Sequence, residues 1–168
     1  NLYTAVDMPA SEFISLYRSG DQRRTKYFKR VTSSTYSLLK GRSDEFSCSF
    51  RTAEFYLTAA EAAARLGHTT DAINYLTPLM AKRLNSSAYQ TTTELINTMK
   101  EEELIQEILD ERARELAFEG HRWYDLRRTT QPALTRVYDG TTYTLLPEQY
   151  TMRFPSEAVE ANPKIELW

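Results

Sequence analysis

The chain has 168 residues, which is enough to bury a substantial core, and its 41% hydrophobic and 26% charged residues are ordinary for a globular protein. Its 21 basic and 23 acidic residues give a net charge of -2, so the overall charge offers no case for a nucleic-acid or anionic-membrane partner. The single cysteine, Cys48, excludes an internal disulfide framework, and no apolar run reaches the ~20 residues of a membrane-spanning helix.

The first 50 residues are rich in Ser, Thr, Tyr and Arg and show little hydrophobic periodicity. We predict that residues 1–50 form an irregular lead-in packed on a helical body. One side of residues 11–17 is apolar at helical spacing, which predicts a short helix there. Short strands or loops are predicted at residues 21–30 and 36–39.

A helical pattern begins at Arg51. Polar side chains recur every three or four residues and form one narrow stripe: Arg51, Glu54, Thr58, Glu61 and Arg65. The rest of the circumference is apolar and includes six alanines between Ala53 and Ala64, which is typical of a helix sandwiched between close neighbours. Gly67 is expected to end this helix, and Thr69 is expected to cap the next one.

The next helix carries Ala72 and Leu76 on one face, and with the preceding helix it resembles one tetratricopeptide hairpin. Pro78 lies inside the pattern, so a kink or a break is expected near Thr77. Residues 86–93 are polar and are interpreted as a linker.

A long helix is predicted over residues 99–119, opened by a capping box of Thr98 with Glu101 and ended by a glycine. A short helix near residues 122–128 is predicted to fold back on it. Residues 51–130 are therefore predicted to form two helical hairpins.

Two charges of the long helix fall where apolar side chains are expected. One face holds four large apolar residues: Ile105, Leu109, Leu116 and Trp123. Arg112 and Glu119 lie within that stripe, and a buried ion without a partner costs several kcal/mol. We therefore predict a tertiary ion-pair cluster that holds two helices in one geometry. The opposite face is predicted to be solvent-exposed and holds Asp110, Glu111 and Arg114.

Residues 131–168 are predicted to form a β-hairpin followed by an extended tail. Asp139-Gly140 is a strong two-residue turn signal between two strand-like segments. Three residues that precede prolines then exclude a long helix in the tail. The whole chain is expected to fold as one domain.

Three segments resemble, in the expected order, the SusD/RagB family of outer-membrane nutrient-binding lipoproteins. They are RTAEFYLTAAEAAARLG (51–67), ERARELAFEGHRWYDLRR (111–128) and RFPSEAVEANP (153–163). The resemblance implies a mainly α fold of tetratricopeptide-like hairpins, an α-α superhelix, with a short β-hairpin and an extended C-terminal tail. Family members are longer and begin with a signal peptide and a lipid-bearing cysteine, so we expect this chain to be the C-terminal part of such a protein.

The second of these segments is the family's signature helix, and we predict a structural role for its charged and aromatic residues. They are Arg112, Glu115, Glu119, Arg122, Trp123, Asp125 and Arg127.

No catalytic residue, metal site or cofactor is predicted, and the protein is not expected to be an enzyme. Glu111, Glu115 and Glu119 are spaced i,i+4 on one helix, so their carboxyl groups cannot straddle a sugar ring as glycoside hydrolysis requires. The interleaved arginines lower their pKa values, which is the wrong direction for a general acid. His68 and His121 are not spaced as a metal-ligand pair. Acidic residues flank the basic pair of the signature segment, so no nucleic-acid partner is expected.

Aromatic side chains outside the regular helices are the candidate ligand contacts, because sugars present apolar faces that lie on Tyr and Trp rings. These candidates are Tyr3, Tyr36, Tyr138 and Tyr143. The resemblance also implies that much of the glycan contact lies N-terminal to this region.

The function implied by the resemblance is non-catalytic capture of glycans at the outer membrane surface, within polysaccharide utilisation, and delivery to a TonB-dependent (SusC-like) transporter. The membrane is expected to be reached only through an N-terminal lipid anchor outside this chain. The alternative is a tetratricopeptide-like adaptor that binds a protein or peptide partner in its groove. Two hairpins offer little concave surface for that role, since such arrays usually need about three units.

Overall fold

A computed structural model describes residues 11–33, 35–40, 51–138, 140–151 and 154–162. Across these ranges the protein is mainly helical, with two short antiparallel strand pairs, which confirms the predicted fold class. The chain divides into two compact units, residues 1–122 and residues 123–168. This division lies inside the predicted helical body of residues 51–130.

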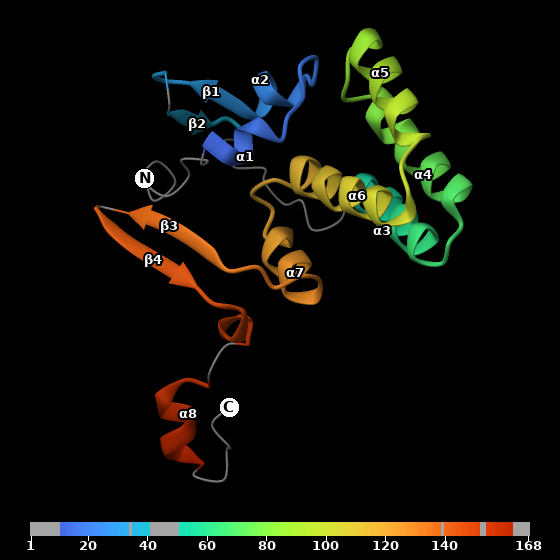
Figure 1. The fold of residues 1–168 in the computed structure, drawn as a ribbon. Coiled ribbons are helices and arrows are strands. Elements are labelled where there is room, and N and C mark those ends of the chain that lie inside the picture. Colours follow the sequence, from blue (N-terminus) through green and yellow to red (C-terminus); the bar gives the residue numbers. More distant parts are fainter. Residues whose placement is uncertain (1–10, 34, 41–50, 139, 152–153, 163–168) are drawn as a thin grey trace. The chain divides into compact units, whose positions relative to one another are not determined.

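The core of the first unit lies among four helices: α3 (Thr52–Arg65), α4 (Thr69–Ala81), α5 (Ser86–Ile96) and α6 (Glu101–Glu115). Helix α3 packs against both α4 and α6, as the green and yellow ribbons of Figure 1 show. Ala60, Ala64 and Ala72 are fully buried at these contacts, because small side chains let the helix backbones approach closely. The predicted sandwiching of α3 is incomplete, since Phe55 is 64% exposed and Leu66 is 71% exposed.

The predicted linker at residues 86–93 is wrong, because these residues belong to α5. The side chain of Asn85 accepts a hydrogen bond from the Ala88 N–H at 2.9 Å and caps the helix. Thr92 and Ile96 are buried on one side of α5. Its run of threonines has low intrinsic helix propensity, and the cap together with tertiary packing overrides that preference.

The capping box predicted from Thr98 and Glu101 does not open the long helix. Helix α6 begins at Glu101, where the Glu103 carboxylate accepts from the Lys100 N–H at 2.8 Å. The Thr98 hydroxyl instead donates to the Leu95 carbonyl at 2.7 Å, so it closes α5 and does not cap α6.

The α4 helix also departs from expectation at its start. Its N-cap position is held by His68, and Thr69 is the first helical residue. Of the kink or break expected near Thr77, the break does not occur, because the helix continues through Pro78 to Ala81.

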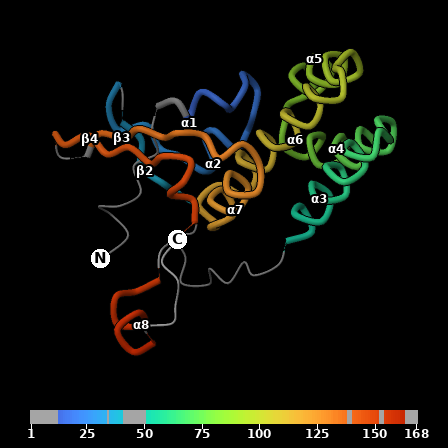
Figure 2. Tube along the Cα trace, turned by 60° about the horizontal axis from the view of Figure 1, so that its bottom comes forward, coloured from blue at the N-terminus to red at the C-terminus, as the bar shows by residue number. Residues whose placement is uncertain are grey.

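The N-terminal segment of the first unit has its own small core. It comprises α1 (Ser11–Ser15), α2 (Arg23–Tyr27) and the antiparallel strands β1 (Phe28–Arg30) and β2 (Tyr36–Leu38), shown in blue in Figure 2. Buried Ile14, Tyr17 and Phe28 form this core.

The same segment is tied to the connection between α4 and α5. The Gln22 N–H donates to the Arg83 carbonyl at 2.9 Å, and the Asn85 N–H donates to the Gly20 carbonyl at 3.0 Å. These bonds flank an isolated β-bridge between Asp21 and Leu84. They bring the N-terminal segment to the four-helix core at a position that no local sequence pattern specifies.

In the second unit, the predicted hairpin is present as β3 (Leu134–Tyr138) and β4 (Thr141–Leu145). Tyr138 pairs with Thr141, so the turn has two residues, and its Gly140 adopts φ 72° as such turns require. The remaining elements are α7 (His121–Arg128), which begins two residues before this unit, a 3-10 turn (Pro147–Tyr150) and α8 (Ser156–Ala161). Among its described residues, the tail therefore contains two short helical pieces in addition to extended backbone.

Candidate functional site

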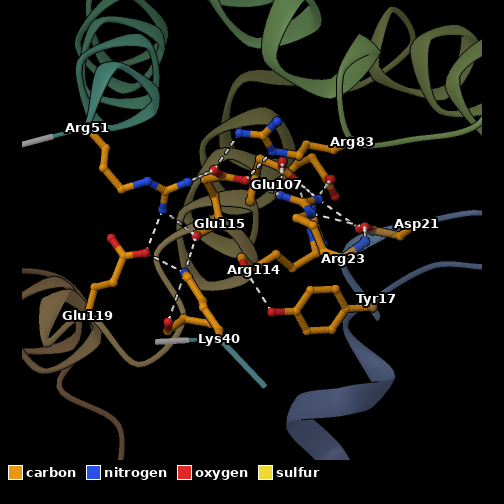
Figure 3. A network of polar contacts seen from close by, with 12 residues as sticks. Tyr17, Asp21, Arg23, Lys40, Arg51, Arg83, Glu107, Arg114, Glu115 and Glu119 are labelled. Atoms are coloured by element: carbon orange, nitrogen blue, oxygen red, sulfur yellow. Dashed lines mark hydrogen bonds and ion pairs between the residues drawn. The ribbon is translucent and has the colours of Figure 1, made fainter. Parts of the chain in front are cut away.

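A buried cluster of charges covers one face of α6 (Figure 3). We call it the charge cluster, and its members are Asp21, Arg23, Lys40, Arg51, Arg83, Glu107, Glu111, Arg114, Glu115 and Glu119. The three glutamates of α6 recur at i,i+4 spacing, which places them in one row along the helix. Cations from four other parts of the sequence meet that row.

Arg23 is the cation nearest the middle of the charge cluster. Its guanidinium lies 2.7 Å from a carboxylate oxygen of Glu111 and 3.0 Å from one of Glu115. It also lies 2.7 Å from Asp21, its neighbour at the start of α2. Arg114 adds bonds along the helix to Glu107 at 2.6 Å and to Glu111 at 2.8 Å. Each buried charge therefore meets an opposite charge with hydrogen-bond geometry, which is the condition under which such groups can be buried.

The other end of the charge cluster completes the C-terminus of α6. Lys40 Nζ donates to the carbonyls of Glu115 at 2.8 Å and Ala117 at 3.0 Å, and Arg51 donates to the Glu115 carbonyl at 3.0 Å. Both cations also pair with the Glu119 carboxylate. The last carbonyls of a helix lack partners within the helix and carry partial negative charge, so two cations stabilise this end.

A tertiary ion-pair cluster is present and includes Glu119, but the predicted solvent-exposed face of α6 is wrong. Glu111 is only 1% exposed and Arg114 only 4% exposed. Tyr17 explains part of this burial, because its hydroxyl donates to the Arg114 carbonyl at 2.8 Å. The segment 13–30 packs over the face that periodicity alone assigns to solvent.

The electrostatics of the charge cluster favour a structural role for its carboxylates over a role in acid catalysis. Burial alone raises the pKa of Glu111, but Arg23 and Arg114 outweigh it and hold that pKa below its usual range. Burial also raises the pKa of Glu115, but its arginine partners, Arg83 most strongly, outweigh burial and lower that pKa. A general acid needs a raised pKa, so these carboxylates stay ionised partners of arginines at neutral pH.

These lowered pKa values predict sensitivity to acid. Because the folded-state pKa of Glu111 and Glu115 lies below the value of 4.5 expected for an unfolded glutamate, their contribution to stability is complete above that pH. It is lost as the pH falls through the folded-state values. Thermal unfolding measured between about pH 7 and about pH 3 is expected to give a level Tm above about pH 5 and a steep fall below about pH 4.5. A Tm that stays level to about pH 3 would contradict this.

The remaining signature residues lie in different surroundings. Arg112 is buried and its guanidinium donates to the Thr58 hydroxyl at 3.2 Å, so it faces α3. Arg122 is exposed. Asp125 is buried and pairs with Arg128 at 2.8 Å, and Arg127 is exposed.

Trp123 and Tyr150 form the main aromatic contact of the second unit. Their rings stack with centroids 5.1 Å apart, and the Tyr150 hydroxyl donates to the Pro132 carbonyl at 2.8 Å. This contact joins α7, which precedes the β3–β4 hairpin in the sequence, to the 3-10 turn that follows the hairpin.

Replacing Arg112 or Trp123 by Ala is expected to lower the free energy of unfolding by about 2–4 kcal/mol, through a lost buried partner in one case and lost ring packing in the other. Thermal unfolding of each variant, beside the exposed-site control Arg127→Ala, measures this. A variant that keeps its Tm but loses ligand binding would reassign that residue from a structural to a binding role.

Of the four tyrosines predicted as candidate ligand contacts, the structure describes the side chains of two. Tyr3 lies outside the described residues, and so does the side chain of Tyr138. Tyr36 is half-buried and packs on the small core of Ile14, Tyr17 and Phe28. Its hairpin position indicates packing more than ligand contact.

Tyr143 remains as an exposed candidate. It is 57% exposed on β4 and stands directly opposite Arg136 of β3. An aromatic ring beside a guanidinium offers a stacking face and hydrogen-bond donors together. Sequence reasoning missed Arg136, although pairing outward from the Asp-Gly turn places it across from Tyr143.

Within the described ranges, no group of three His, Cys, Asp or Glu side chains is placed to hold a metal ion. None of the helices in those ranges is both long enough and apolar enough to cross a membrane.

Comparisons with known proteins agree with this architecture. The model of the SusD family matches residues 9–164. SusD-like protein P38 of Formosa agariphila is 39% identical over 83 residues, which are 49% of this chain and 16% of that protein. A crystal structure of a SusD-like carbohydrate binding protein from Bacteroides vulgatus ATCC 8482 superposes with a TM-score of 0.58 at 23% identity, covering 92% of this chain and 40% of that one.

This chain therefore spans less than half the length of either relative. The family match extends over nearly all of its residues and includes the three segments that carry the resemblance. The chain belongs to the SusD family.

Proposed function

We propose that this protein takes part in capturing glycans at the outer membrane surface and delivering them to a TonB-dependent transporter. The family match over residues 9–164 carries the proposal. The fold shared with a solved SusD-like carbohydrate binding protein supports the same reading of the architecture. In this role the helical unit is a rigid support, held together by the charge cluster.

The proposed capture involves binding without catalysis. The acidic side chains gathered on α6 are paired with arginines, and Glu111 and Glu115 have lowered pKa values. Carboxylates held ionised on a single helix do not provide the facing acid and base that glycoside hydrolysis uses.

The exposed apolar face of α3 supports a protein partner, and we propose the transporter. Phe55, Ala62 and Leu66 are exposed, and their spacing of seven and eleven residues places them on one side of the helix. Exposed apolar side chains in a row are typical of a contact surface. The adaptor alternative would instead place a protein or peptide partner in the groove of the helical hairpins.

A glycan array run with this chain beside the longest chain its gene encodes tests the capture function. Tyr143→Ala is the informative variant. Val137→Ala is its matched control, because Val137 is also exposed but lies on the other face of the same hairpin.

Binding of the same glycan by both chains, weakened by Tyr143→Ala and not by Val137→Ala, would place a contact on the hairpin. Binding by the long chain alone would keep the capture function and make these residues its support. Binding of no sugar by either chain would overturn glycan capture and favour the adaptor.

A further inference from the structure

The cations of this chain are distributed unevenly along the sequence. Between Asp21 and Asp44 there are seven Lys and Arg and no acidic residue. The rest of the chain holds 14 basic and 23 acidic residues. The net charge of -2 therefore conceals a basic segment within an otherwise acidic protein.

The structure separates these cations into two groups. Arg23 and Lys40 turn inward and pair with carboxylates of the charge cluster. Four others are exposed on α2 and β1, and among the described residues none of them forms an ion pair; we call them the cationic patch: Arg24, Lys26, Lys29 and Arg30.

The backbone beneath the cationic patch is held in place. Arg30 donates to the carbonyls of Thr32 and Ser33 at 3.0 and 3.1 Å, across the turn between β1 and β2. Phe28, which lies between Lys26 and Lys29 in the sequence, is buried in the small core with Ile14 and Tyr17. The fold therefore holds the backbone that carries these cations, and it also holds the guanidinium of Arg30, which lowers part of the entropic cost of binding a ligand there.

We propose that the cationic patch binds an acidic glycan, one that carries carboxylate or sulfate groups. The inference rests on the proposed glycan capture and deepens it by naming the substrate class. Four exposed cations lie within seven residues and form no ion pair with any described residue, which matches a ligand with repeated negative charges, because several contacts can form along one polymer. The acidic remainder of the chain repels such a polymer elsewhere, which favours this segment over other surfaces.

A lipid surface fits the same patch less well. Helices that lie in a membrane interface use a continuous apolar face opposite their cations. Helix α2 has five residues, and its exposed positions are Arg24, Thr25 and Lys26. It therefore has charges to attract a surface but no apolar face to insert.

The test measures the affinity of the longest chain the gene encodes for polygalacturonate, for uncharged dextran of matched length and for phosphatidylglycerol vesicles. The informative variant is Arg24→Gln/Lys29→Gln, since neither side chain makes an ion pair within the described residues. Lys82→Gln/Lys100→Gln is the control, because both lysines are exposed outside the patch and the change in net charge is the same.

We expect polygalacturonate binding at about 50 mM salt, weakened about tenfold in Arg24→Gln/Lys29→Gln and nearly unchanged in the control. Raising the salt to about 300 mM should weaken wild-type binding several-fold, because the screening length shortens. Both variants should keep the wild-type Tm.

Other outcomes separate this inference from the proposed function. Dextran binding as tight as polygalacturonate binding, with both variants unchanged, would keep glycan capture and overturn the acidic-glycan inference. Equal weakening in both variants would assign the effect to net charge and overturn the patch. Binding to vesicles alone would overturn it in favour of a lipid surface, and binding to no polysaccharide of a full glycan array would overturn both proposals.

Discussion

Replacing Glu115 by Gln is expected to lower the free energy of unfolding by about 3–5 kcal/mol, a large share of the stability of an ordinary domain. Glu115 is fully buried, and its carboxylate pairs with Arg23, Arg51 and Arg83. A neutral amide leaves those cations partly uncompensated, and the cost is greatest at Arg23, whose side chain is buried away from water. Urea or thermal unfolding of the variant measures the loss.

Glu102→Gln is the matched control, because Glu102 is exposed on the same helix and its loss should change stability by about 0.5 kcal/mol or less. A double-mutant cycle with Arg83→Met sharpens the test, since the arginine should be worth less once Glu115 is neutral. Additive effects of the two substitutions would contradict the proposed coupling between them.

Gly20→Ala should also destabilise the protein strongly, by about 2–4 kcal/mol. Gly20 has φ +85°, and an added Cβ would lie 2.6 Å from the Cβ of Ala88 and 2.8 Å from the side chain of Asn85. The cost combines a backbone conformation that favours glycine with a collision at the cap of α5. Thermal unfolding measures the change.

Gly67→Ala separates the two causes. Gly67 has φ +75°, but an added Cβ would have no neighbour within 4 Å. Gly67→Ala should therefore lower the free energy of unfolding by about 1–2 kcal/mol, which is the cost of the positive φ alone. Equal losses at the two glycines would show that the close approach of Gly20 to α5 does not matter for stability.

The charged signature segment shows which buried charges hydrophobic periodicity predicts and which it does not. The position of Arg112 within an apolar stripe predicted its burial, and the structure pairs it with Thr58 of α3. The same reasoning assigned Glu111 and Arg114 to solvent, and both are buried. Periodicity separates the apolar face of a helix from its polar face. It does not tell whether another segment of the chain packs over the polar face and buries it.

Helix termini show a similar limit. Thr98 and Asn85 are both good capping residues by type. The structure uses Asn85 to begin α5 and Thr98 to close it. Capping preference identifies residues that favour helix ends, and the chain's tertiary path decides which end each one serves.

By itself, the sequence determined the mainly helical class, the α3–α4 hairpin and the two-residue turn of the β3–β4 hairpin, because these depend on spacing and backbone preferences within a few residues. It also carried the family motifs. Only the tertiary structure decided which cations of the N-terminal segment enter the charge cluster and which stay exposed. Arg23 and Arg24 are neighbours of the same type, yet one meets Glu111 and the other meets solvent. Their difference arises from contacts 88 residues apart in the chain, which local patterns do not encode.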